Sequence, residues 1–377
     1  MICSSISFLG YRNLEEQTVE FSPGVNVLWG DNAQGKSNVL EGIYFFARGR
    51  SFRGAKEREL IRFGEKYAQL SLTYREEGAA YPVTLEADLP LAGKKVLRRG
   101  GARLSGMREL IGSFRSVLFC PLHLSLVSGA PALRRSFLDI ALSQLYPGYL
   151  VSLSRYNRIL AQRNALIKAG EDAADRGMYE VYARQLASLG ADIAARRHVY
   201  MEALETYVAE IFSGMTGERE IPQLCYHSGA KPEEDADAED IRRLGEEKLY
   251  AALTGSIERE IRYGATLFGV HKDDIVLRLN GREARSYASQ GQQRSLALAM
   301  KLAEGELSKR ISGQYPVFLL DDVLSELDGG RRAFILQALT GRQIIVTSCE
   351  PGLFQTDAVG DARLLRVENG SIIKEDP

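Results

Sequence analysis

The sequence predicts an α/β fold in which one discontinuous domain is interrupted by a helical insertion. Three observations predict it: a strand, glycine-rich loop and helix near the N-terminus, a long helical stretch in the middle, and strand–helix alternation that returns afterwards. A chain of 377 residues also exceeds the size at which one hydrophobic core keeps growing. We therefore expect residues 1–120 and 265–377 to form one lobe, and residues 121–264 to form an inserted helical arm.

The N-terminal part has the pattern of β-strands. The stretches "CSSISFLG" and "QTVEF" alternate with a period of about two, and "PGVNVLWG" is an apolar run between turn residues. From Lys36 to Ala47 the apolar residues recur at helical spacing. Two more strand patterns follow, "YAQLSLTYR" and "YPVTLEADL", and then the glycine- and arginine-rich hairpin "GKKVLRRGGARLSG".

The middle of the chain is helical. We expect helices over about residues 131–168 and 176–212, much longer than the globular mean, and therefore a projecting arm. The acidic stretch "KPEEDADAED" is interpreted as a solvated loop. The alternation then resumes in this order: strand "DDIVLRLNG", helix "QQRSLALAMKLAEGELSKR", strand "PVFLLDD", helix "GGRRAFILQALTG" and strand "RQIIVTS".

The composition narrows the possible environment and partners. With 48 Lys and Arg against 49 Asp and Glu, contact with nucleic acid must come from local patches, since no global positive field exists. The scattered cysteines Cys3, Cys120, Cys225 and Cys349 predict free thiols in a reducing compartment, and argue against a zinc site. The N-terminus lacks a signal-peptide pattern and no apolar run approaches about 18 residues, so we expect a cytoplasmic protein without membrane contact.

A phosphate-binding loop follows the third strand pattern. The stretch "GDNAQGKS" has the spacing G-x-x-x-x-G-K-[ST], between a buried strand and a helix, as that motif requires. Lys36 is expected to reach the β- and γ-phosphates, and Ser37 to hold Mg²⁺. The competing interpretation is an ordinary strand–turn–helix whose glycines are accidental. The residues expected to bind the nucleotide here are Gly30, Asp31, Asn32, Ala33, Gln34, Gly35, Lys36 and Ser37.

Two acids follow the apolar run "VFLL". A parallel sheet places ligand groups at the carboxyl ends of its strands. Asp321 is therefore expected to orient Mg²⁺ on the phosphates, and Asp322 to position or deprotonate the attacking water. The alternative is a pair of solvated acids at a strand end.

A third motif, "YASQGQQRSLALAM", precedes a helix with an apolar face. Ser289, Gly291 and Gln292 would form a second anion-binding helix terminus, although the same residues could be an ordinary N-cap. One chain would then contain two phosphate-binding helix N-termini. We expect the second to close over the nucleotide of another subunit.

These motifs together resemble the head of an ABC-type ATPase, and within that superfamily they resemble the RecF family. The resemblance runs through nearly the whole chain in family order. The segments that carry it are "GDNAQGKSNVLEGIY", "GRSFRGAKERELIRFG", "GAPALRRSFLD", "RYNRILAQRN", "GVHKDDIVLRLNG", "ASQGQQRSLALAMKLAE" and "LLDDVLSELD".

The resemblance implies ATP and Mg²⁺ as cofactors, with Ser289 meeting the γ-phosphate of the opposing subunit. It implies that residues 325–328 form a dimer-contacting loop and that Arg12 lies near the phosphates. Asp322 stands where ABC ATPases usually have glutamate, and Thr347 stands where transporter ATPases have a switch histidine. Slow hydrolysis, as in RecF-like proteins, fits the second departure.

By the same resemblance, the chain is expected to be a weak, DNA-stimulated ATPase that forms an ATP-dependent homodimer. It would bind double-stranded and gapped DNA, and would help to load RecA together with RecR, with RecO acting indirectly. An SMC-like chromosome-organising ATPase is one alternative, but it needs hundreds of residues of coiled coil. A transporter ATPase subunit is another, but it needs an intact L-S-G-G-Q and a switch histidine.

Local basic runs could contact DNA phosphates independently of sequence. Solvated surface is the alternative for both. A hydrogen-bonded structural histidine is the expectation for His271, since no second histidine is nearby to complete a metal site. The basic runs hold Arg48, Arg50, Arg53, Lys56 and Arg58 in the first, and Lys94, Lys95, Arg98, Arg99 and Arg103 in the second.

Overall fold

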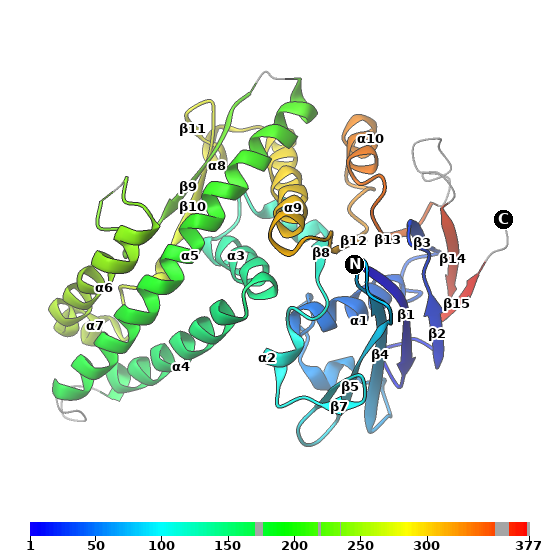
Figure 1. The fold of residues 1–377 in the computed structure, drawn as a ribbon, viewed down its shortest axis with the longest axis horizontal. Helices are drawn as coiled ribbons and strands as arrows, with labels where there is room; N and C mark the ends of the chain where they lie inside the picture. Colours follow the sequence, from blue (N-terminus) through cyan, green and yellow to red (C-terminus); the bar gives the residue numbers. More distant parts are fainter. Residues whose placement is uncertain (170–175, 218–219, 234, 351–361, 375–377) are drawn as a thin grey trace. The chain divides into compact units, whose positions relative to one another are not determined.

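The computed structural model describes residues 1–169, 176–217, 220–233, 235–350 and 362–374, which divide into two compact units (Figure 1). The first unit is discontinuous, Met1–Ser125 with Ala297–Pro377, and the second is Leu126–Leu296. A discontinuous α/β unit with a largely helical insertion is the fold class that the sequence predicts. The insertion, however, ends near residue 296 and not near 264. The reason is that β10 (Asp274–Leu279) pairs with β9 (Pro222–His227) of the arm.

The glycine-rich loop leaves a sheet whose central strands β3, β13 and β12, together with β8, are almost entirely buried. Its order is β15-β14-β3-β13-β12-β8, and every neighbouring pair is parallel except β14 with β15. The sequences of buried parallel strands are nearly continuous apolar runs, as in "VFLLD" and "IIVTS". The carboxyl ends of β3, β13 and β12 therefore share one edge. The strands are β3 (Val25–Trp29), β8 (Ser116–Phe119), β12 (Val317–Asp321), β13 (Ile344–Ser348), β14 (Arg363–Glu368) and β15 (Ser371–Lys374).

An antiparallel sheet completes the first unit. Its order is β2-β1-β4-β5-β6-β7, and the inward side chains alternate along β4 and β5. Helix α1 (Lys36–Arg48) buries most of its length in a core shared with both sheets, including Phe45 and Phe46. The other elements of this unit are β1 (Ile2–Leu9), β2 (Gln17–Glu20), β4 (Tyr67–Arg75), β5 (Val83–Pro90), β6 (Val96–Arg99), β7 (Ala102–Arg103), α2 (Met107–Leu110), α10 (Gly329–Ala338) and the 3₁₀ turns Glu57–Leu60 and Pro121–Ser125.

The second unit is built around one long helix, α5 (Arg176–Thr216), with α4 and α6 packed along it (Figure 1). A small antiparallel sheet of order β11-β10-β9 packs on α5 as well. The remaining elements are α3 (Pro131–Leu145), α4 (Pro147–Ala169), α6 (Ala238–Gly255), α7 (Ile257–Tyr263), the 3₁₀ turn Val270–Lys272, β11 (Arg282–Glu283), α8 (Ala284–Tyr287) and α9 (Gln290–Ser312), whose last two-thirds belong to the first unit.

Two expectations about the arm are wrong in detail. The helix predicted over residues 131–168 is interrupted at Tyr146, which is extended, because proline at position 147 disfavours a helical conformation in the residue before it. The acidic stretch is not all loop: Asp237 caps α6, accepting a hydrogen bond from the Asp240 amide at 2.9 Å. Position 234 of that stretch lies outside the described residues.

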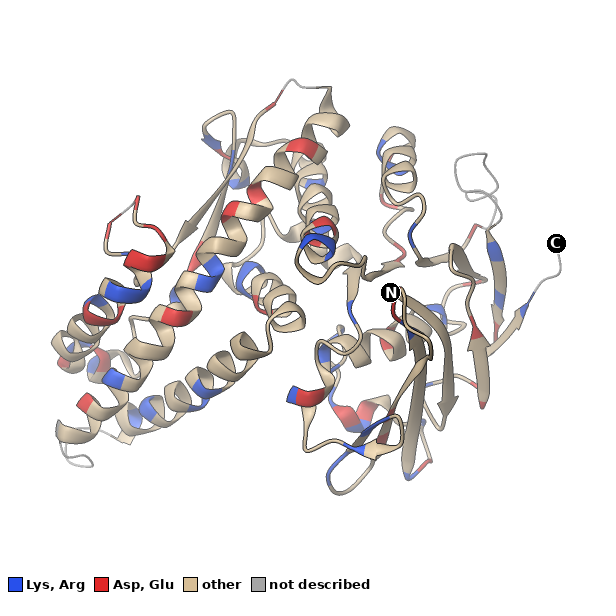
Figure 2. Ribbon diagram, viewed as in Figure 1, with Lys and Arg blue, Asp and Glu red and all other residues tan. Residues whose placement is uncertain are grey.

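Charges of both signs are interspersed along α5 and α6 (Figure 2). Two arginines of this unit are buried and paired: Arg197 on α5 with Asp139 and Asp273, and Arg163 on α4 with Glu260. Within the described part of the chain, every helix falls short of the length and apolar character needed to cross a membrane.

Candidate nucleotide site

The loop between β3 and α1 is shaped by residues with positive φ. Gly30, Ala33 and Gly35 have φ values of 145°, 65° and 119°. A Cβ on Gly30 would lie 2.3 Å from the carbonyl oxygen of Val367, so only glycine fits against that strand. The loop therefore runs close to its neighbours and leads directly into the N-terminus of α1, the positive end of a helix where phosphates bind.

Lys36 lies across this loop and is 8% exposed. Its Nζ donates to the carbonyl oxygens of Gly30 at 2.5 Å and Asp31 at 2.8 Å, and it lies 3.5 Å from Sγ of Cys349. Neutral carbonyl oxygens satisfy the ammonium donors but leave the positive charge uncompensated. An anion entering the loop would therefore be favoured here.

A cavity of about 150 Å³ opens above the loop. Asp322 and Thr347 come from the ends of β12 and β13, so the parallel sheet brings them to the loop as expected. Arg53 also lines the cavity, and its guanidinium donates to Oδ1 of Asn38 at 3.0 Å. The cavity is lined by Asn32, Ala33, Gln34, Gly35, Lys36, Ser37, Asn38, Arg53, Asp322 and Thr347.

The two acids at the end of β12, Asp321 and Asp322, are held by the same threonine. The hydroxyl of Thr347 donates to Oδ1 of Asp321 at 3.1 Å and accepts from the amide of Asp322 at 2.9 Å. Asp322 has φ of 51°, a conformation that non-glycine residues rarely adopt and that is common at functional sites. Thr347 thus orients both acidic residues.

Asp321 is buried, and this burial raises its pKa, while a hydrogen bond from Ser37 and the charge of Arg53 oppose the rise. A cation beside Asp321 would favour the ionised carboxylate over the protonated one. The hydroxyl of Ser37 and this carboxylate are hard oxygen donors, and Mg²⁺ usually takes only one or two protein ligands besides phosphate and water. The residues present therefore fit Mg²⁺ on a bound nucleotide. Among the described residues, no group of three or more His, Cys, Asp or Glu side chains is placed to hold a metal by itself.

Ser289, Gly291 and Gln292 belong to the second unit, whereas the loop belongs to the first. Ser289 caps α9: its Oγ accepts from the Gln292 amide at 3.2 Å, and its own amide donates to Oε1 of Gln292 at 2.6 Å. This reciprocal pair is a capping box. Ser289 is exposed, so it is presented to solvent at the positive end of a long helix.

Arg12 is not among the residues that line the cavity. Its guanidinium makes two 2.9 Å hydrogen bonds with the buried carboxylate of Glu41 on α1. The neighbouring Asn13 contacts the loop instead, donating to the Ala33 carbonyl at 3.3 Å and accepting from Asn38 at 2.7 Å. A role for Arg12 at the phosphates stays a prediction.

The two basic runs are only partly available for DNA. In the second run, Lys95 pairs with Glu57, Arg98 with Asp88 at 2.7 Å, and Arg99 donates to Ser113 at 3.4 Å. In the first run, Arg53 faces the nucleotide cavity. His271 is hydrogen-bonded to the Tyr156 hydroxyl at 2.8 Å and the Thr266 carbonyl at 3.1 Å, and burial lowers its pKa to about 4, so it is a structural histidine.

Sequence reasoning missed Asn13, Asn38, Arg53 and Cys349 at the site. Asn38 follows Ser37 directly, and its polar side chain on the first turn of a buried helix was a usable signal. Cys349 lies two residues beyond Thr347, and its Sγ is 3.2 Å from Oδ1 of Asn32.

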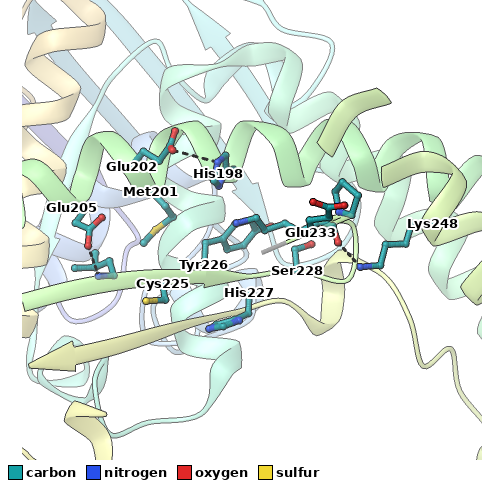
Figure 3. Close-up of a pocket in the computed structure, with 13 residues that line it drawn as sticks. His198, Met201, Glu202, Glu205, Cys225, Tyr226, His227, Ser228, Glu233 and Lys248 are labelled. Carbon is teal, nitrogen blue, oxygen red and sulfur yellow. Dashed lines mark hydrogen bonds and ion pairs between the residues drawn. The ribbon is translucent and has the colours of Figure 1, made fainter. Parts of the chain in front are cut away.

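A larger cavity, about 470 Å³, lies in the second unit between α5, β9 and the segment before α6 (Figure 3). His198, Met201, Glu202 and Glu205 face it from α5. No residue of the glycine-rich loop lines it. Size alone therefore does not identify the nucleotide site, which is recognised by its chemistry.

Cys349 provides a chemical probe of the site, because it is exposed and touches both Asn32 and Lys36. Alkylation with N-ethylmaleimide is expected to weaken ATP binding at least tenfold, since the added group fills a small cavity, and saturating ATP should slow the labelling. Fluorescence polarisation with labelled ATP checks this. Cys349→Ser is the control, because it keeps Cys225 and should bind ATP equally well before and after treatment. Equal loss in both proteins would contradict the placement of Cys349.

Comparison with known proteins places these observations in context. The family model described as RecF/RecN/SMC N terminal domain matches residues 2–371. The chain is 37% identical over 385 residues to a protein of Lactobacillus delbrueckii subsp. bulgaricus named DNA replication and repair protein RecF, covering all of this chain and 98% of the relative. A Halalkalibacterium halodurans protein of the same name is 38% identical over 368 residues, with 97% of each chain covered.

Solved structures agree with this result. A structure described as the recombination mediator protein RecF with ATPrS in the RecFOR pathway superposes with a TM-score of 0.90 at 34% identity, covering 99% of this chain and 98% of that one. The Smc head domain of Pyrococcus furiosus superposes with a TM-score of 0.58 at 15% identity, which shows a shared fold.

Proposed function

Because the chain belongs to the RecF family of ABC- and SMC-type ATPases, we propose that it is an ATP-binding protein of recombinational DNA repair. The observation that carries the proposal is the loop itself: Lys36 lies on the loop carbonyls, with Asp322 and Thr347 lining the same cavity. Relatives named DNA replication and repair protein RecF, and a structure described with an ATP analogue in the RecFOR pathway, support it. Those names provide the DNA-repair context.

In this proposal, the amides of residues 30–37 receive the phosphates at the positive end of α1. Lys36 exchanges the carbonyl oxygens of Gly30 and Asp31 for the β- and γ-phosphates, gaining charge-assisted hydrogen bonds. Arg53, on the cavity wall, adds a second cation. Asn38 donates to Asn13, which donates to the Ala33 carbonyl, so the loop backbone stays in place while Lys36 changes its partners.

Ser37 and Asp321 would hold Mg²⁺, which would neutralise charge on the phosphates when bound. Asp322 would orient or deprotonate the attacking water, because it is exposed at the cavity and its backbone is fixed by Thr347. A threonine cannot accept a proton as a histidine does at neutral pH. Slow turnover is therefore the expected behaviour. Stimulation by DNA is proposed separately, from the family to which the chain belongs.

Ser289, Gly291 and Gln292 would complete the site of a second subunit. The helix terminus that they form attracts an anion, and the γ-phosphate is the anion exposed when ATP lies in the loop. ATP would then join two chains that ADP leaves apart. Duplex DNA near single-strand gaps, RecR, and through it RecO and RecA, are the partners proposed for the closed dimer.

Sedimentation velocity tests the proposal. The chain is expected to be monomeric with ADP and dimeric with ATP, Mg²⁺ and a gapped duplex, and ATP hydrolysis should rise when the duplex is added. A chain that stays monomeric with saturating ATP and DNA would refute the ATP-dependent clamp. Omitting Mg²⁺ should remove the dimer, since Ser37 and Asp321 then lack the ion that they would share with ATP.

A chromosome-organising role of the SMC type is the weaker alternative. The similarity to Smc heads is 15% identity, against 37% over the full length for the relatives named RecF. Similarity at that level supports a common fold and not a common function.

A further inference from the structure

The capping box at the start of α9 depends on one amide side chain. Gln292 Oε1 accepts from the Ser289 backbone amide, while the Gln292 backbone amide donates to Ser289 Oγ. The Ser289 oxygen is used as an acceptor in this arrangement, so its O–H remains able to donate to a phosphate. The Gln292 side chain therefore holds the backbone of Ser289, while the Gln292 backbone amide holds the Ser289 hydroxyl oxygen.

That orientation is fixed by a carboxylate from a distant part of the chain. Nε2 of Gln292 donates to Oε1 of Glu220. An ionised carboxylate only accepts hydrogen bonds, so it selects the amide orientation with Nε2 toward Glu220 and Oε1 toward Ser289. Without Glu220, this preference between the two ends of the amide is lost.

Glu220 is itself held by the arm. It directly precedes Ile221, whose amide donates to Oδ1 of Asn280 at 2.8 Å and whose carbonyl accepts from the Asn280 amide at 2.9 Å. Two residues into β9, the Leu224 amide donates to Oε1 of Glu205 on α5 at 3.0 Å. A continuous set of contacts thus runs from α5 through β9 to Glu220 and the serine cap.

We propose that Glu220 is a positioning residue for the ATPase reaction: it orients Gln292, and through it the Ser289 cap, toward the nucleotide of a second subunit. This inference rests on the proposed function. It also predicts that a shift of β9 relative to α5, within the second unit, would change the cap. Glu220 acts through Gln292 and has no role in binding ATP within its own chain.

Single variants separate this role from a structural one. Glu220→Ala is expected to lower kcat and the ATP-dependent dimer affinity by on the order of tenfold, the effect of losing one charge-assisted hydrogen bond. Its binding of labelled ATP, measured at concentrations where the chain is monomeric, should equal that of the wild type. Glu220→Gln keeps an acceptor for Nε2 but no longer excludes the opposite orientation of the Gln292 amide, so it should be less impaired than Glu220→Ala. Glu210→Ala, an exposed carboxylate on α5, is the matched control and should change nothing.

A paired exchange of donor and acceptor gives the sharpest readout. Gln292→Glu keeps the capping box but sets two carboxylates against each other, so dimerisation and kcat should fall about tenfold. Adding Glu220→Gln should restore most of that loss, because the amide introduced at position 220 can then donate to the carboxylate introduced at position 292. Circular dichroism verifies that each variant is folded.

Failure of the inference and failure of the proposed function give different results. A wild type that never dimerises with ATP refutes the proposed function. If the wild type does dimerise, three results would overturn the role of Glu220 alone. Glu220→Ala could behave like the wild type, Glu220→Gln could be as impaired as Glu220→Ala, or the paired exchange could fail to restore dimerisation and kcat.

Discussion

Replacing Lys36 by methionine is expected to weaken ATP binding by about 100-fold, with the ATP-dependent dimer lost at the same ATP concentration. Nζ of Lys36 is held by two loop carbonyls and is the buried cation of the loop. Charge-assisted hydrogen bonds are each worth about 1.5–3 kcal/mol, and about 3 kcal/mol corresponds to 100-fold in Kd. Methionine keeps an unbranched side chain, one heavy atom shorter than that of lysine, and removes the charge and the donors.

Isothermal titration calorimetry with ATP and Mg²⁺ measures this loss. Lys66→Met is the matched control, because Lys66 is exposed in the turn before β4 and the same chemical change there should leave Kd unchanged. Equal ATP affinity in Lys36→Met and the wild type would mean that this loop is not the nucleotide site. The fluorescence of Trp29, the only tryptophan and the residue before Gly30, verifies that the loop remains folded.

The phosphate-binding loop could be predicted from the sequence because its motif consists of consecutive residues. The roles proposed for Gly30, Lys36 and Ser37 depend on backbone shape and on side chains at a fixed spacing, and the strand and helix around them are strong local patterns. Asp321 and Asp322 were predictable for a related reason, since the end of a buried parallel strand is a defined place in space. The structure brings Asp322 and the loop to one cavity.

Arg53 and β10 illustrate what the sequence could not provide. In the sequence, Arg53 is one of several basic residues in a run. It lines the cavity because the segment that follows α1 folds back beside the loop, which the local pattern does not predict. The strand pattern at β10 was recognised, but its lobe depends on pairing with β9, whose six-residue sequence "PQLCYH" begins with proline. Strand pairing is non-local, so a local pattern predicts that a strand exists and not which sheet it joins.

Arg197→Met is expected to destabilise the arm by about 3–5 kcal/mol, the usual cost of removing one partner of a buried ion pair. The guanidinium of Arg197 is almost fully buried and donates to Asp139 at 2.8 Å and to Asp273 and the Val270 carbonyl at 2.9 Å. Both aspartates lose their cation in the variant. Asp273 is itself buried and keeps only neutral donors such as the Tyr226 hydroxyl.

The deficit should depend on pH in a defined direction. Burial already raises the pKa of Asp273, and the charge of Arg197 opposes that rise, so removing Arg197 raises the folded-state pKa further. When the pKa of a carboxyl group is higher in the folded state than in the unfolded state, the protonated group stabilises the folded protein. That contribution to the free energy of unfolding is lost as the pH rises through the folded-state pKa. Arg197→Met should therefore differ least from the wild type near pH 4 and most at pH 7 to 8, and adding Asp273→Asn should recover part of the loss at neutral pH.

Hydrogen exchange of the α5 amides measures this effect within the second unit, and Trp29 fluorescence reports independently on the first. Arg196→Met is the matched control on the same helix, because Arg196 is 37% exposed and pairs with Asp192 within one turn. Exposed pairs contribute about 0–1 kcal/mol, so its α5 amides should exchange nearly as slowly as those of the wild type. Two results would contradict this account: an equal loss of amide protection in both variants, or a loss in Arg197→Met that does not depend on pH. In either case the packing of α5 against α3 and the Val270–Lys272 turn would not depend on the buried charges.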